Sequence, residues 1–120
     1  MQKRILLLDN DGDLLRLADD MMYYGYSDVH ITSDSHSVYS IAKNYKPDLI
    51  ILDFLLIDER DASICETFKH DAEFKDVPVI LISTFQNKKI DLNGFSHDAL
   101  FMKPLDTEKL ASTINYLVAS

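Results

Sequence analysis

Short apolar runs alternate with stretches of helical periodicity along the whole chain. Five short runs predict strands, and most of them are apolar almost throughout, as expected of strands buried on both faces of a sheet. They cover residues 4–8, 29–32, 48–53, 78–82 and 99–102. Between and after them, apolar residues recur every three or four positions, which predicts amphipathic helices over residues 13–24, 38–45 and 62–70 and after Asp106. Residues 86–98 are the least periodic and predict at most one short helix.

This order of elements predicts an α/β fold. Strands that alternate with helices, and that are apolar on both sides, form parallel sheets covered by helices on both faces. We therefore expect a three-layer sandwich with a five-stranded parallel sheet. The chain of 120 residues contains no internal repeat or linker, so we expect one domain over residues 1–120.

The composition argues against some classes of binding partner. The chain has 20 acidic and 12 basic residues and a net charge of −8, which argues against direct binding to nucleic acid or to an anionic membrane. No apolar run approaches the roughly 20 residues that span a bilayer, and the run that ends at Asp9 is too short for a secretion signal. The only cysteine, Cys65, lies on the apolar face of a predicted helix, where we expect it in the core. We expect a cytoplasmic protein.

Polar residues stand where the predicted strands end. Asp9, Asp53, Ser83 and Lys103 follow or end the first, third, fourth and fifth apolar runs. The carboxyl ends of parallel strands share one edge of the sheet, where ligands bind in open α/β folds. These four side chains are therefore expected to converge on one pocket.

The residue types in this set suit phosphoryl transfer. Clustered carboxylates repel one another and favour a hard cation such as Mg²⁺. The carboxylate of Asp53 could attack a phosphorus atom in line, while Ser83 donates a hydrogen bond and Lys103 offers a compact positive charge to the phosphoryl oxygens. Phosphoryl transfer needs little beyond such positioning and charge stabilisation.

Four motifs carry a resemblance to a known family. Together and in this order, ILLLDN, DLIILD, PVILIST and FMKPL closely resemble the receiver domain of two-component response regulators, the CheY-like family, over the whole chain. The resemblance implies a flavodoxin-like sheet of order 2-1-3-4-5. It implies that Asp53 accepts a phosphoryl group from a histidine kinase or a histidine phosphotransfer protein and that a downstream effector protein or domain reads the result. Such a domain is not an enzyme in the usual sense, because it catalyses only its own phosphorylation and dephosphorylation.

The resemblance also assigns individual roles. It implies Mg²⁺ ligands at Asp9, Asn10, Asp53 and the main-chain carbonyl of Leu55. It implies phosphate contacts from Ser83, from the main-chain N–H of Thr84 and from Lys103, and a cis peptide bond before Pro104.

Three positions depart from the family pattern. Asn10 stands where a second carboxylate is usual, which lowers the negative charge of the metal site and its expected affinity for Mg²⁺. Leu100 stands at the position of an aromatic switch residue. Residues 57–61 replace the usual Pro-Gly loop after Asp53, and we expect residues 58–61 to form a solvated loop.

The segment DNDGD at residues 9–13 has other possible interpretations. A calcium loop that starts at Asp9 would need its turn glycine at position 14, which is Leu14. A haloacid-dehalogenase-like phosphatase would use Asp9 as nucleophile and Asp11 as general acid, but it would leave Asp53 unexplained. A binding module of receiver fold that works without phosphorylation is the third alternative. The sequence disfavours the first and leaves the other two open.

Overall fold

The computed structural model of the chain describes residues 3–9, 14–56, 59–85 and 98–119. Strands and helices alternate as predicted, and within these residues the sheet has five parallel strands in the order β2-β1-β3-β4-β5. The strands are β1 (Arg4–Leu8), β2 (Asp28–Thr32), β3 (Leu49–Leu56), β4 (Val79–Phe85) and β5 (Ala99–Met102). The helices are α1 (Leu14–Tyr23), α2 (Val38–Tyr45), α3 (Glu59–His70) and α4 (Thr107–Val118). The predicted fold class and strand order are confirmed.

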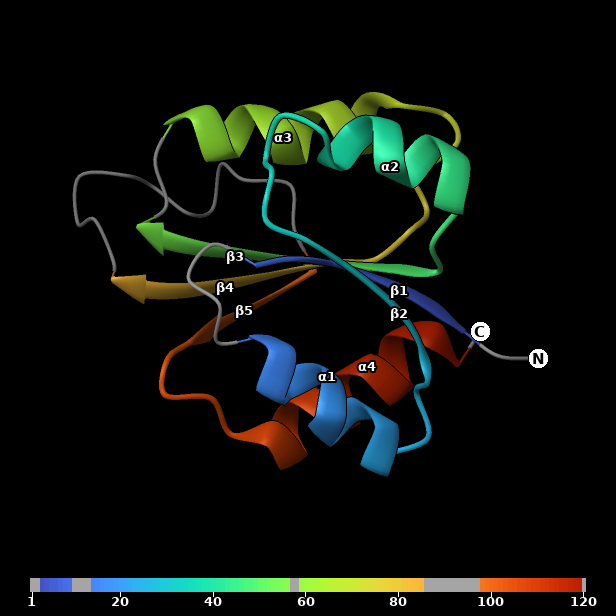
Figure 1. Cartoon of the computed structure of the whole chain (residues 1–120). Coiled ribbons are helices and arrows are strands. Elements are labelled where there is room, and N and C mark those ends of the chain that lie inside the picture. The colour runs from blue at the N-terminus through green and yellow to red at the C-terminus, as the bar shows by residue number, and fades with distance from the viewer. Residues whose placement is uncertain (1–2, 10–13, 57–58, 86–97, 120) are drawn as a thin grey trace.

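The helices form two layers, one on each face of the sheet (Figure 1). Helices α2 and α3 cover one face, and their apolar side chains share a core cluster with alternate residues of β1, β3 and β4. Cys65 and Phe68 of α3 are fully buried there, as the helical pattern predicted. The rings of Phe68 and Phe74 meet edge to face, with centroids 5.3 Å apart.

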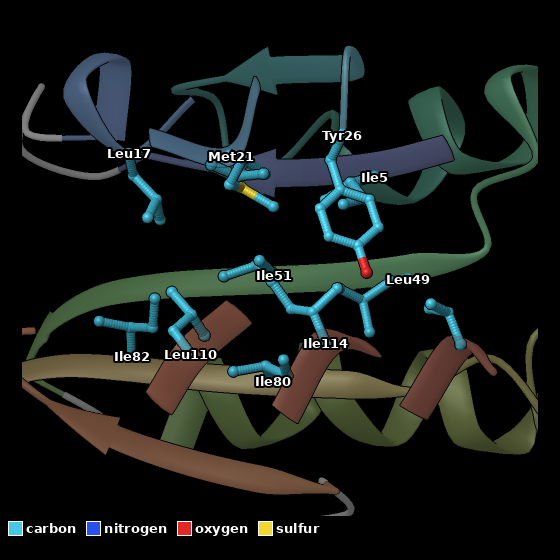
Figure 2. Close-up of a cluster of buried hydrophobic side chains, with 12 residues drawn as sticks. Ile5, Leu17, Met21, Tyr26, Leu49, Ile51, Ile80, Ile82, Leu110 and Ile114 are labelled. Carbon is cyan, nitrogen blue, oxygen red and sulfur yellow. The ribbon is translucent and has the colours of Figure 1, made fainter. Parts of the chain in front are cut away.

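Helices α1 and α4 cover the other face of the sheet (Figure 2). Leu17 and Met21 of α1 and Ile114 of α4 pack on the strand residues of opposite parity to those under α2 and α3. This alternation explains why the central runs are apolar throughout, because both sides of each strand are buried. None of the described helices is long and apolar enough to cross a membrane.

Local sequence signals set several element ends. Asp106 caps α4, since its carboxylate accepts a hydrogen bond from the main-chain nitrogen of Lys109 at 3.2 Å. Gly25 has a φ of 97°, a conformation that side chains disfavour, and it follows the last turn of α1. Lys46 ends α2 in the left-handed region with a φ of 56°.

Three predicted boundaries were wrong in detail. Strands β3 and β4 continue three residues beyond the predicted ends at residues 53 and 82, because parallel pairing extends to Leu56 and Phe85. Helix α3 starts at Glu59 rather than at residue 62, so residues 59–61 are helical and not the expected loop. Periodicity could not detect this start, because Glu59, Arg60 and Asp61 are all charged and add no apolar position to the helical pattern. The predicted short helix falls on residues 86–97, which lie outside the described residues.

A charged cluster joins α2 to the turn that follows α3. The ammonium of Lys43 lies 2.7 Å from Asp71 and 3.0 Å from Glu73, and it also lies over the rings of Tyr39 and Phe74. The hydroxyl of Tyr39 donates a hydrogen bond to the carboxylate of Asp71. The hydrogen bonds from Lys43 and Tyr39 lower the pKa of Asp71 from its usual 3.8 to about 2.

This pKa shift predicts a specific loss of stability in acid. The folded state binds the Asp71 proton less tightly than the unfolded state, so the carboxylate stabilises the fold above pH 3.8 and loses this effect as the pH falls toward 2. We expect Asp71→Asn to be less stable than the wild type at pH 6, with the difference shrinking between pH 4 and 2. Urea unfolding followed by far-ultraviolet circular dichroism over this pH range measures the difference in the free energy of unfolding. A difference that does not change with pH would show that the charge of Asp71 contributes nothing.

Candidate functional site

The buried polar residues of the described chain are the residues predicted for the site. Among the residues whose burial is assigned, the buried polar or charged ones are Asp9, Asp53 and Ser83. Asp9 directly follows β1, Asp53 lies near the carboxyl end of β3, and Ser83 lies near that of β4. Burial of carboxylates costs free energy unless charged or hydrogen-bonding groups compensate it. Two buried acids at one sheet edge therefore indicate a functional site rather than a packing requirement.

Lys103 supplies the compensating charge for Asp53. Its Nζ donates a hydrogen bond to Oδ2 of Asp53 at 2.9 Å, and the two form an ion pair across 50 positions of sequence. The side chain of Asp53 is 1% exposed and that of Lys103 is 13% exposed. Little water screens a pair this deeply buried, so the attraction between the two charges is strong.

The sheet register brings these residues together. Parallel pairing aligns Asp53 with Ile82, so that Ser83 lies one position further along β4. The main-chain nitrogen of Lys103 donates to the carbonyl oxygen of Ser83 at 2.9 Å, which continues the pairing of β4 with β5. The peptide bond between Lys103 and Pro104 is cis, as the family resemblance implied.

Side-chain parity explains how Asp53 and Lys103 meet. Asp53 continues the alternation of Leu49 and Ile51, which belong to the core under α1 and α4. Lys103 stands two positions after Phe101 and so continues the same alternation on β5, and Phe101 packs against the same core. Both therefore lie on the same side of the sheet near its carboxyl edge, where the Lys103 side chain reaches across β4 to Asp53. The predicted convergence of sequence-distant polar residues is thus observed directly for Asp53 and Lys103.

The donor atoms at this edge suit Mg²⁺. Asp9 and Asp53 offer buried carboxylate oxygens, and Leu55 belongs to β3 and offers a main-chain carbonyl beyond Asp53. Oxygen donors are what a hard divalent cation prefers. In the described residues no group of three or more His, Cys, Asp or Glu side chains comes together.

Three further residues were singled out from the sequence, and the structure describes two of them. Asn10 lies outside the described residues, so its part in a metal site stays a prediction. Thr84 continues β4 directly after Ser83, which puts its main chain at the same edge. Leu100, at the position of the family's aromatic residue, is half-buried against the core cluster under α2 and α3.

One polar contact of the sheet was not predicted from the sequence. Asp98, which precedes β5, accepts hydrogen bonds from Lys69 of α3 and from the main-chain nitrogen of Val79. No sequence pattern indicated it, because residues 86–98 lack periodicity and a lysine at position 69 is read from the sequence as an ordinary polar helix residue. This contact lies at the end of β5 opposite to Lys103.

Comparison with known proteins gives consistent matches. The model of the response regulator receiver domain family matches residues 5–115. The DNA-binding dual master transcriptional regulator RpaA of Synechocystis is 28% identical over 120 residues, which cover 96% of this chain and 48% of RpaA. The polar-differentiation response regulator DivK of Brucella anthropi is 25% identical over 119 residues, which cover 95% of this chain and 94% of DivK.

Solved structures show the same fold at lower identity. The chemotaxis protein CheY4 of Vibrio cholerae superposes with a TM-score of 0.80 at 17% identity, over 98% of this chain and 99% of that one. The chain spans about half the length of RpaA and a smaller share of some other curated relatives, such as 26% of the response regulator PleD of Caulobacter vibrioides.

Proposed function

Because the chain belongs to the response regulator receiver domain family, we propose that Asp53 accepts a phosphoryl group from a phosphohistidine. The donor would be a histidine kinase or a histidine phosphotransfer protein in the cytoplasm, and the reaction would use Mg²⁺. The observation that carries this proposal is the buried carboxylate of Asp53, held 2.9 Å from the ammonium of Lys103 at the carboxyl edge of the sheet.

Each site residue would have its own role in phosphoryl transfer. A carboxylate oxygen of Asp53 forms a bond to phosphorus while the bond between phosphorus and the donor imidazole breaks, and the departing imidazole takes a proton from water. The ammonium of Lys103 moves from Asp53 to a phosphoryl oxygen, and the hydroxyl of Ser83 and the main-chain N–H of Thr84 donate to others. A bound Mg²⁺, held by oxygens of Asp9, Asn10, Asp53 and Leu55, would supply positive charge that offsets the phosphoryl charge.

Phosphorylation would then bias a binding surface. Ser83 lies on β4, and its hydroxyl would hydrogen-bond a phosphoryl oxygen only after phosphorylation, so the phosphorylated state favours a different position of the chain that follows β4. An effector protein or domain would read the surface between Ser83 and Asp98. The shift can be no larger than the difference in stabilisation that the phosphoryl group gives to the two positions.

Mapping the phosphorylated residue tests this function. The protein is incubated with acetyl phosphate and Mg²⁺, and the acyl phosphate is reduced with borohydride, which converts the modified aspartate to homoserine. We expect peptide mass spectrometry to find this conversion at Asp53. A matched sample without Mg²⁺ should show much less conversion of Asp53 to homoserine.

The same experiment separates the alternatives that the sequence left open. Conversion at Asp9 instead of Asp53 would contradict the proposal and favour the phosphatase interpretation. No conversion with acetyl phosphate or with a phosphorylated histidine phosphotransfer protein would favour a binding module that works without phosphate.

A further inference from the structure

Strand β5 is fastened at both ends to the unit formed by β3 and α3. At the carboxyl edge of the sheet, Lys103 pairs with Asp53 of β3. At the amino edge, Asp98 pairs with Lys69 in the last turn of α3, with Nζ and Oδ2 at 3.1 Å. Because α3 follows β3 directly in the chain, both charged pairs tie β5 to one continuous unit. An extended chain from residue 98 to residue 103 is about 16 Å long.

Besides its ion pair with Lys69, Asp98 makes hydrogen bonds with the main chain of Val79. Its Oδ2 accepts a hydrogen bond from the main-chain nitrogen of Val79 at 2.8 Å, and its own main-chain nitrogen donates to the carbonyl of Val79 at 2.8 Å. Lys69 also donates to the carbonyl of Val77 at 2.9 Å. The start of β5 is therefore bound both to the start of β4 and to α3.

Apolar packing fixes β5 less firmly than it fixes β4. The β4 residues Val79 to Ile82 are fully buried, whereas those of β5 are half-buried and Met102 is 37% exposed. Among the described strands, β5 lies at the edge of the sheet and pairs with β4. Register is weakly specified where burial is incomplete, so polar contacts at its ends have a larger share in fixing its position.

We propose that Asp98 is a positioning residue for the site: by holding the start of β5 against Val79 and Lys69, it sets where Lys103 meets Asp53. The proposal rests on the proposed function only where it concerns the rate of phosphorylation. The placement of Lys103 is a property of the unphosphorylated protein and can be measured without any phosphodonor.

Three variants separate the contacts of Asp98. Asp98→Ala removes both the acceptor for Val79 and the partner of Lys69. Asp98→Asn keeps an acceptor oxygen of the same reach and removes only the charge. Asp71→Asn is the matched control, because it removes an ion pair of the same helical layer that does not touch β5.

The first measurement is the side-chain and main-chain NMR spectrum of Lys103 without Mg²⁺ or phosphodonor. We expect Asp98→Ala to shift the Cε and Hε signals of Lys103 and to speed hydrogen exchange of its amide, which bonds to Ser83 in the wild type. Asp98→Asn should restore most of the wild-type spectrum, and Asp71→Asn should leave these signals unchanged.

The second measurement is the rate of phosphorylation by acetyl phosphate at saturating Mg²⁺. Small displacements of a reacting group cost large factors in rate, so we expect a roughly tenfold lower maximal rate in Asp98→Ala. The apparent affinity for Mg²⁺ should not fall, since the expected ligands lie outside β5 and a displaced Lys103 competes less with the cation for Asp53. A lower melting temperature with unchanged Lys103 signals would overturn the proposal, because Asp98 would then serve stability alone. If the wild type is not phosphorylated, the proposed function fails and the NMR measurement still decides the role of Asp98.

Discussion

Asp53→Asn is expected to abolish phosphorylation by acetyl phosphate or by a phosphohistidine donor, while the protein stays folded. An amide lacks the anionic oxygen that attacks phosphorus in the proposed reaction. The volume of the side chain hardly changes, and its remaining oxygen can still accept the hydrogen bond from Lys103. We therefore expect the free energy of unfolding to change by only about 1 kcal/mol.

Intact-mass spectrometry after incubation with acetyl phosphate and Mg²⁺ measures the first effect, and urea unfolding measures the second. Asp9→Asn is the matched control, because Asp9 is also a buried acid of the same edge. In that variant Asp53 should still be phosphorylated, but at a higher Mg²⁺ concentration. Full phosphorylation of Asp53→Asn would show that another residue is the phosphoacceptor and would contradict the proposed function.

The architecture was predictable because burial leaves a strong signal in the sequence. Continuous apolar runs such as ILLL and DLIIL identified strands covered on both faces, and the helical spacing of Cys65 and Phe68 identified an inward face that the structure confirms. Strand order was a different matter. The alternation of elements predicted a parallel sheet, but the order β2-β1-β3-β4-β5 came only from the family resemblance, since apolar runs do not say which strand pairs with which.

The site was predictable to the extent that it depends on strand ends. Asp53 and Lys103 could be placed together because parallel strands share one carboxyl edge, and the structure joins them by a hydrogen bond. The contact between Lys69 and Asp98 could not be foreseen. It depends on how α3 crosses the sheet and on which carboxylate meets its last turn, and neither leaves a periodic pattern.

Lys103→Met is expected to lower the free energy of unfolding by about 3 kcal/mol near pH 7 in the absence of divalent cations. The substitution keeps the length of the side chain but leaves the carboxylate of Asp53, which is 1% exposed, without the ammonium that now lies 2.9 Å away. A buried charge without its counter-charge is costly because water cannot reach it. Asp53→Asn should cost less, since Lys103 is 13% exposed and can turn its ammonium toward water.

Phosphorylation should slow in the same variant, since the ammonium of Lys103 is lost to the phosphoryl oxygens. We expect a decrease of roughly a hundredfold, comparable to the loss of one charge-stabilising donor in other active sites. Lys103→Arg is the matched control. It keeps the positive charge and should retain most of the stability, although the planar guanidinium cannot place its charge at the same point as an ammonium.

The response to Mg²⁺ distinguishes this account from a general loss of packing. In the wild type, Lys103 already neutralises Asp53, so a cation at the site must compete with it for the carboxylate. In Lys103→Met that competition is absent, and a bound Mg²⁺ supplies the positive charge that the ammonium no longer brings to Asp53. We therefore expect Mg²⁺ to bind more tightly to the variant and to raise its unfolding free energy more than that of the wild type. Urea unfolding over a series of Mg²⁺ concentrations measures this, and equal stabilisation of both proteins would show that Lys103 and the cation do not share Asp53.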